Sequence, residues 1–214
     1  MTLRLLLIRH GETEWNSLRR IQGQLDIPLN EVGRGQARAV ARRLGATPVA
    51  AVYTSDLARS SQTAEPIAAA CGVAARVDLR LRERHFGGLQ GCYYEELQKS
   101  DPERHRRMQA RDLDFDLDGG ETLPDLHRRV IEALDDIAAR HPEGAVVVVT
   151  HGGVLDCAYR LATGLALDAP RAHGLFNASV NTLEVDAGGY RLVDWGDVAH
   201  LGAPADEIDT RLLN

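Results

Sequence analysis

Three short apolar runs predict buried β-strands, and two of them end in a His-Gly pair. They cover residues 3–8, 50–53 and 145–150. The first and third are apolar at nearly every position, which is typical of strands covered on both faces of a parallel sheet. The first run leads into Arg9-His10-Gly11, and the third leads into His151-Gly152. The pattern therefore places similar polar residues after two separate buried strands.

Segments with helical spacing of apolar residues alternate with these runs. The first such helix, 31–44, is stopped by Gly45 and Pro48, and a second is expected to begin at Ser55 or Asp56 as N-cap. Residues 78–84 fit either a strand or a loop. The helix capped at Ser55 or Asp56 is expected to run through 57–67 towards Gly72. The other expected elements are helices over 121–140 and 154–162, and a hairpin of strands 180–186 and 190–195 joined by Ala187-Gly188-Gly189.

This alternation predicts an α/β fold in which a doubly wound, mostly parallel sheet has helices on both faces, giving three layers. With 214 residues the chain is expected to form a single domain, 1–214, with an irregular insertion at about 84–120 over the site. The carboxyl ends of parallel strands share one edge of such a sheet, and ligands bind outside that edge. His10 and His151 are therefore expected to meet.

The composition is typical of a globular enzyme, and it excludes some classes of binding partner. Apolar residues make up 44% and charged residues 26%, and the net charge of -6 argues against nucleic-acid or anionic-membrane binding. The apolar runs are too short to cross a bilayer, and the first is read as a strand rather than a signal peptide. The three cysteines lack paired or metal-like spacing, which favours a cytoplasmic location. The alternating acids of 112–118 lack the spacing of a calcium loop and predict a solvated loop.

The residues around the two histidines point to phosphate. A glycine after each histidine lets the backbone approach a ligand and can open a helix whose first N–H groups face an anion. Arg9 adds positive charge and a planar fork of donors suited to phosphoryl oxygens. Unprotonated imidazole can act as a nucleophile near neutral pH without a metal. The sequence therefore predicts a phosphate site built around histidine.

Six blocks of the chain resemble the histidine phosphatase superfamily, in the branch of the cofactor-dependent phosphoglycerate mutases and their phosphatase relatives. The resemblance covers nearly the whole chain, and the blocks stand in the family's order. They are LIRHGET (7–13) with Asn16, GQLDIPLNE (23–31) with Gly33, SDLAR (55–59) with QTA (62–64), LRERHFG (81–87), GET (120–122) and THGG (150–153).

The resemblance implies a catalytic role for five of these residues. His10 would be the nucleophile, Arg9 and Arg59 would hold the phosphoryl oxygens, and His151 would donate to them as charge builds. The two arginines should also keep His10 neutral, because a like charge disfavours imidazolium. Glu83 would protonate the leaving oxygen and later deprotonate the attacking water. The implied substrate-binding residues are Asn16, Gln22, Gly23, Arg84 and Gly152.

Each residue also has a structural reading. Arg9 and Arg59 could be surface ion-pair partners, and Glu83 stands between Arg82 and Arg84, where a solvated salt bridge is the default. The ordered set of motifs outweighs that reading. A structural role is expected for His85, His127, His173 and the apolar-face residue Cys157.

Three function classes remain. The favoured one is a metal-independent phosphatase of small phosphorylated metabolites, with no cofactor. A bisphosphoglycerate-primed mutase is the alternative: 83–91 resembles the mutases and Arg106-Arg107 resembles their substrate-binding pair, but a mutase has tyrosine at Phe86 and lysine near Tyr94. An inactive phospho-ligand-binding module is the third. The sequence leaves the substrate open among sugar phosphates, phosphoglycerates, ribazole phosphate and phosphoprotein. A homodimer is compatible with it.

Overall fold

The computed structural model describes residues 1–202, which contain a mixed sheet of six strands in the order β3-β2-β4-β1-β5-β6. Strands β3, β2, β4 and β1 run parallel, and β5 and β6 form an antiparallel hairpin at one side. The strand bounds are β1 Leu3–Arg9, β2 Ala51–Thr54, β3 Ala75–Val77, β4 Gly144–Thr150, β5 Val180–Asp186 and β6 Gly189–Asp197.

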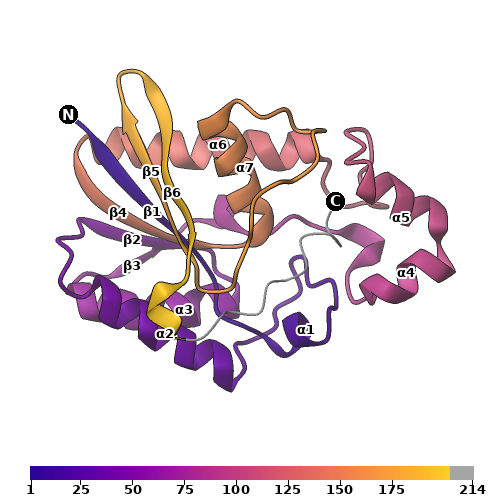
Figure 1. Cartoon of the computed structure of the whole chain (residues 1–214), viewed down its shortest axis with the longest axis horizontal. Coiled ribbons are helices and arrows are strands. Elements are labelled where there is room, and N and C mark those ends of the chain that lie inside the picture. The colour runs from indigo at the N-terminus through magenta and orange to yellow at the C-terminus, as the bar shows by residue number, and fades with distance from the viewer. Residues whose placement is uncertain (203–214) are drawn as a thin grey trace.

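Helices cover both faces of the sheet (Figure 1). Helices α2 (Glu31–Leu44) and α3 (Ala58–Cys71) pack on one face, and α6 (Leu123–Arg140) and α7 (Gly152–Thr163) pack on the other. Strand β1 supplies both cores, because alternate side chains point to opposite faces: Leu5 and Leu7 belong to one, Leu6 and Ile8 to the other. The three-layer, mostly parallel α/β fold predicted from the sequence is confirmed.

The stretch predicted as an irregular insertion contains two short helices, so that part of the prediction was wrong. Helices α4 (Tyr94–Ser100) and α5 (Pro102–Gln109) stand apart from the sheet (Figure 1). The missed signal is Asp101-Pro102, in which the Asp101 side chain accepts from the Arg104 N–H and Pro102 occupies the first helical turn. A separate apolar cluster supports the insertion and contains Ile21, Leu89, Leu97, Phe115 and Leu117.

The loop predicted over 112–118 is present. Phe115 and Leu117 point into the small cluster, while Asp114, Asp116 and Asp118 are exposed. The description of the whole chain as one domain with an insertion at 84–120 stays a prediction.

Several element boundaries differ from the prediction. Helix α3 begins after Leu57, not after Ser55 or Asp56, and its first N–H, on Ala58, donates instead to the distant Asp26 side chain at 2.6 Å. Strand β3 ends before residue 78, and Leu79–Leu81 form a 3₁₀ turn where the sequence suggested strand or loop. Helix α7 begins at Gly152, two residues earlier than expected, so its N-terminus lies directly beside His151.

Remaining elements are close to the prediction. Helix α6 begins at Leu123, with the Thr122 side chain accepting from the Asp125 N–H as N-cap. The one-turn helix α1 (Glu14–Ser17) was not predicted, and it carries a capping box made by Thr13 and Asn16.

The loop that follows β1 packs backbone against backbone on the start of α2. A Cβ atom on Gly33 would overlap the carbonyl oxygen of Glu12, and one on Gly11 would overlap the carbonyl oxygen of Gly33. The Asn30 side chain caps α2 by accepting from the Gly33 N–H at 2.8 Å. Both glycines are therefore required by close approach, and α2 fixes the position of the loop.

We expect Gly33→Ala to destabilise the protein by roughly 1–3 kcal/mol, because backbone atoms of the His10 loop must move to admit the methyl group. The matched control is Gly35→Ala in the same helix, where the nearest atom to a Cβ is the mobile end of the Arg38 side chain. There we expect stabilisation of about 1 kcal/mol from helix propensity. Urea unfolding of both variants checks this, and equal effects of the two substitutions would contradict the close-packing argument.

Candidate active site

Parallel pairing of β1 with β4 brings the two His-Gly pairs together. Arg9 pairs with Thr150 in the register, and the His10 N–H donates to the Thr150 carbonyl at 2.9 Å. The imidazole rings of His10 and His151 lie with their centroids 5.2 Å apart. The two histidines predicted to meet at the carboxyl edge of the sheet do so.

The His10 ring has a defined tautomer. Its Nδ1 lies 2.7 Å from the Gly11 carbonyl oxygen, which can only accept, so Nδ1 carries the proton and Nε2 keeps its lone pair. The residue is 3% exposed. Burial, and then the charges of Arg59 and Arg9, hold the pKa of His10 well below its usual 6.5. The neutral form is therefore the stable one at neutral pH.

Two buried arginines flank His10. Arg9 is 5% exposed and Arg59 1% exposed. Arg59 donates to the backbone carbonyls of Gly23 at 2.6 Å and Leu25 at 2.9 Å, and Arg9 donates to that of Leu175. Burial lowers the pKa of each arginine to about 10, with the charge of Glu83 opposing, so both remain cationic at neutral pH.

Several buried polar atoms around His10 lack a hydrogen-bond partner among residues 1–202. They are Nε of Arg9, Nε of Arg59, Nδ1 of His151 and the side-chain oxygen of Gln22. A buried group without a partner costs roughly 1–3 kcal/mol, and more when it is charged. Two charged donors orphaned at one place indicate a site built for an anion.

Nine of the ten residues predicted for the site line one cavity. His151 is the exception: it is completely buried beside His10, with its Nε2 2.8 Å from the Ser55 hydroxyl. Burial and then the Arg59 charge lower the pKa of His151 well below its usual value. The nine lining residues are Arg9, His10, Asn16, Gln22, Gly23, Arg59, Glu83, Arg84 and Gly152.

Glu83 lies at the N-terminus of α7. Its carboxylate accepts from the Arg84 N–H at 2.7 Å and from the Gly153 N–H at 3.0 and 3.2 Å. A Cβ on Gly153 would overlap that carboxylate, so the glycine admits it. The solvated salt bridge considered for Glu83 is not what the structure shows, because backbone N–H groups hold the side chain against the cavity.

Arg84 mainly holds the insertion in place through hydrogen bonds to backbone carbonyls. Its guanidinium donates to the carbonyls of Glu121 at 2.8 Å and Phe115 at 3.0 Å, and burial lowers its pKa to about 10. Arg106 and Arg107, the pair that resembles a mutase motif, are instead paired with Glu103 and Asp112 and do not line the cavity.

A second polar cluster forms the far wall of the cavity and was missed from the sequence. Asp156 on α7 accepts from Arg111 at 2.7 Å and from Arg171 at 3.1 Å, and Arg160 donates to it from the same helix at 3.0 Å. Arg111, Arg171 and Asp156 line the cavity together with the hydroxyl-bearing Tyr94. The available signal was Asp156 and Arg160, four residues apart on the inward face of an otherwise apolar helix.

Other missed residues act behind the histidines. The Thr63 hydroxyl accepts from the Gly11 N–H at 3.0 Å, and the Asn177 amide donates to the His10 carbonyl at 2.9 Å. Both orient the loop that carries His10. Thr63 stands in the QTA block that carries the family resemblance, but no role was assigned to it, and Asn177 stands outside every block.

The histidines and cysteine assigned structural roles lie off the cavity wall. His173 stacks on Tyr159 with ring centroids 3.7 Å apart and contacts Asp156, and Cys157 is a buried free thiol whose pKa burial raises. His85 and His127 are only partly buried.

Within residues 1–202 we find no cluster of three or more histidine, cysteine or acidic side chains that could hold a metal ion. In the same residues no helix is long and apolar enough to span a bilayer.

The fold and site together define an α/β protein with a buried cationic anion site around an unprotonated histidine. The chain belongs to the histidine phosphatase superfamily (branch 1), whose family model matches residues 5–198. It is 42% identical to phosphoglycerate mutase-like protein 4 of Arabidopsis thaliana, over 92% of this chain and 86% of that protein. It is also 42% identical to a metal-independent phosphoserine phosphatase of the same plant, over 93% and 83%.

A solved structure shares the fold. Bacillus stearothermophilus YhfR superposes with a TM-score of 0.86 at 37% identity, covering 93% of this chain and 99% of that one.

We expect the folded protein to keep His10 neutral, with the proton on Nδ1, as the pH falls through 6.5, the usual pKa of the group. In urea the same residue should titrate near that value. Nitrogen-15 NMR of labelled protein, with His10→Gln used for assignment, measures both the charge and the tautomer. Arg59→Gln should raise the pKa only in part, because burial, the larger cause, remains. A folded-state pKa at or above 6.5 would contradict this electrostatic account.

Proposed function

We propose that the chain is a metal-independent phosphatase of small phosphomonoesters that works through a phosphohistidine on His10. The observation that carries the proposal is the Nε2 lone pair of a neutral His10 beside orphaned arginine donors. In the first step Nε2 attacks phosphorus and the bond from phosphorus to the ester oxygen breaks. In the second step water attacks the phosphohistidine and releases inorganic phosphate.

Glu83 supplies and recovers the proton in this scheme. As an acid it protonates the departing alkoxide, and as a base it then takes a proton from the attacking water. Support comes from its place on the cavity wall, where its carboxylate stands on the first turn of α7. No further residue is required for proton balance over one turnover.

The remaining residues stabilise the phosphoryl group as its charge redistributes. Arg9, Arg59 and the Nδ1 side of His151 are preorganised in a buried environment, where fixed donors act more strongly than in water. The cradle is completed by Asn16, Gln22, Gly23 and the N-terminal amide of Gly152, which begins α7.

Hydrolysis is favoured over the mutase reaction. A mutase must retain a bisphosphate while it reorients, which calls for additional cations over the cavity. The resemblance to the mutases implies a tyrosine at the position of Phe86 and a lysine near that of Tyr94, and Arg106 and Arg107 form ion pairs on the outer surface. The phosphoserine phosphatase relative supports hydrolysis, while the mutase-like relative keeps isomerisation as the alternative.

The charge of the cavity wall supports a substrate with a second anionic group. Six arginines and two carboxylates line it: Arg9, Arg20, Arg59, Arg84, Arg111 and Arg171 against Glu83 and Asp156. With Glu83 protonated, as its acid role requires, and the other groups ionised, the wall carries six positive charges and one negative charge, a net +5, and a phosphomonoester dianion leaves +3. A carboxylate on the alcohol portion of the substrate, as in phosphoserine, would meet Arg111 and Arg171.

A cytoplasmic location and a homodimer stay predictions. The location is supported by Cys71, Cys92 and Cys157, which are free thiols, as expected in a reducing compartment.

The mechanism predicts an acid-labile, base-stable phosphoenzyme that forms without metal. Excess chelator should leave turnover intact, and His10→Ala should abolish phosphoenzyme and hydrolysis. Rapid quench with ³²P-labelled substrate followed by acid and base treatment measures the intermediate. Loss of activity on chelation would refute the metal-independent scheme.

A parallel assay separates hydrolysis from isomerisation. Bisphosphoglycerate-primed interconversion of 2- and 3-phosphoglycerate at about 1 to 1,000 per second, the range typical of enzymes, would place the chain among the mutases.

The substrate class predicts a preference for O-phosphoserine over O-phosphoethanolamine, which differs only in lacking the carboxylate. A hydrogen-bonded charge contributes about 1.5–3 kcal/mol, so the ratio of kcat/KM values should be roughly 10- to 100-fold. Arg171→Gln should reduce that ratio. Arg106→Gln, which makes the same change of charge on the outer surface, should leave the ratio as it is. An equal rate on both esters in the unmodified enzyme would rule out carboxylate recognition.

A further inference from the structure

The segment that carries Glu83 is held mainly by side-chain donors. After the 3₁₀ turn Leu79–Leu81 it leaves regular structure and runs along α6. Four successive carbonyls, those of residues 80–83, accept hydrogen bonds from side chains of other elements. The Leu81 carbonyl accepts from the Thr150 hydroxyl at 2.9 Å, and the other three accept from Arg129.

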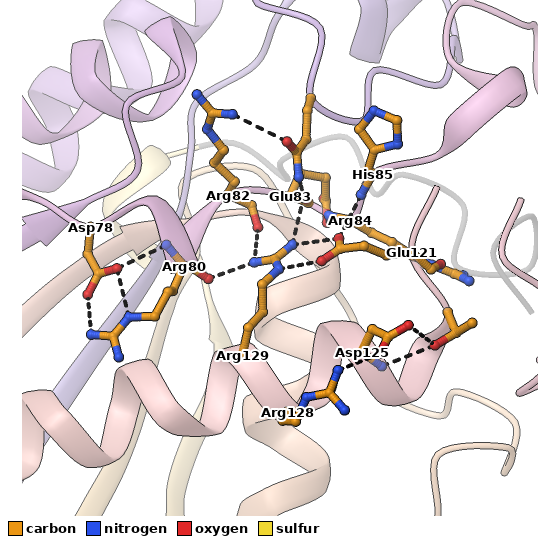
Figure 2. A network of polar contacts seen from close by, with 12 residues as sticks. Asp78, Arg80, Arg82, Glu83, Arg84, His85, Glu121, Asp125, Arg128 and Arg129 are labelled. Atoms are coloured by element: carbon orange, nitrogen blue, oxygen red, sulfur yellow. Dashed lines mark hydrogen bonds and ion pairs between the residues drawn. The ribbon is translucent and has the colours of Figure 1, made fainter. Parts of the chain in front are cut away.

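Arg129, on α6, uses all five of its N–H groups at this place (Figure 2). Nη1 donates to the Arg80 and Arg82 carbonyls at 2.6 and 2.8 Å, and Nη2 donates to the Glu83 carbonyl at 2.9 Å. Nε and Nη2 also donate to the Glu121 carboxylate at 2.6 and 2.8 Å. Only a planar guanidinium offers five donors in this fixed arrangement.

Glu121 extends the contact to the far side of Glu83. Its carboxylate accepts from the His85 N–H at 2.8 Å, and its own N–H donates to the His85 carbonyl at 2.9 Å. Burial alone would raise the pKa of Glu121, but the hydrogen bonds and charge of Arg129, together with the His85 N–H and the charge of Arg84, outweigh it and lower that pKa. The Glu121 and Arg129 side chains are 20% and 18% exposed. Glu121 is therefore ionised at neutral pH, and its ion pair with Arg129 is largely shielded from solvent.

This pair sets where the Glu83 carboxylate stands. Hydrogen bonds fix the backbone on both sides of Glu83. Arg129 binds the carbonyls of residues 80, 82 and 83, and Glu121 binds the backbone of His85. The side chain then rests on the N–H groups of Arg84 and Gly153. A shift of this segment would move the carboxyl group relative to the phosphoryl cradle, although neither Arg129 nor Glu121 lines the cavity.

We propose that Arg129 and Glu121 are positioning residues that hold Glu83 in line with the leaving oxygen of the substrate. The inference rests on the proposed function, since it assigns Glu83 a proton to transfer. A surface salt bridge would not require the three carbonyl contacts, and its loss would affect stability alone. Loss of a positioning pair must instead slow selectively the step in which Glu83 protonates the leaving oxygen.

The test compares phosphoenzyme formation from an alkyl ester, O-phosphoserine, with that from p-nitrophenyl phosphate, whose leaving group needs no proton. Glu83→Gln sets the reference: a loss of roughly 100- to 10,000-fold with the alkyl ester and a much smaller loss with the aryl ester. Arg129→Lys keeps one charge but cannot meet five acceptors. This substitution should lower the rate of phosphoenzyme formation from the alkyl ester by roughly 10- to 100-fold with little change in KM, and it should lower the rate from the aryl ester much less.

The double variant Glu83→Gln/Arg129→Lys decides whether the two residues act through one another. If Arg129 acts through Glu83, the double variant is no slower than Glu83→Gln alone. The matched control is Arg128→Lys, the adjacent residue on α6, whose side chain is 68% exposed and paired with Asp125. It should leave both rates unchanged.

Two kinds of result would overturn the inference, and only the second would also refute the acid role of Glu83. Equal losses on both esters in Arg129→Lys, or an additive double variant, refute the positioning role and leave the acid role of Glu83 intact. If Glu83→Gln itself shows no dependence on the leaving group, the acid role and the positioning role both fail. Should Arg129→Lys not fold, Glu121→Gln keeps the oxygen that receives the His85 N–H, and it must show the same ester selectivity on a smaller scale.

Discussion

The parallel pairing of β1 with β4 in the middle of the sheet is the constraint on which the site depends. It aligns Arg9 with Thr150, and one further backbone hydrogen bond, from the His10 N–H to the Thr150 carbonyl, continues the ladder one residue past the end of β1. Because both strands are buried on both faces, the residues that follow them are buried as well. An imidazole in such a place loses its ordinary basicity, and an arginine there must find carbonyl oxygens or an anion.

The sequence predicted the parts of the molecule that depend on local patterns. Continuous apolar runs identified β1 and β4, helical spacing identified α2 and α6, and the motifs at strand ends identified His10, Arg9 and His151. Arg59 and Glu83 followed from resemblance and not from pattern, because an arginine or a glutamate on a polar surface looks the same in sequence as one that turns inward. Their roles stay predictions, whereas their places in the fold are now known.

The features that escaped prediction are those that depend on long-range contacts. Helices α4 and α5 bury little apolar surface, and their apolar residues show no strong helical periodicity. The only sequence signal for them was the helix start at Asp101-Pro102. Asp156 accepts from Arg111 and Arg171, which lie in separate parts of the chain. Arg129 meets carbonyls nearly fifty residues away in the sequence. Such contacts come from the folded geometry, and residue type alone does not reveal them.

The insertion has its own small apolar cluster, in which Leu89, Leu97 and Phe115 pack without joining the cores on either face of the sheet. Substitutions in α4 and α5 can therefore accumulate at little cost to the layers that hold His10 and His151. In evolutionary terms, the part of the cavity wall that Tyr94 on α4 and Met108 on α5 supply can change without disturbing the phosphoryl cradle. One chemical mechanism can then be passed to new metabolites by changing a segment that the central sheet does not need.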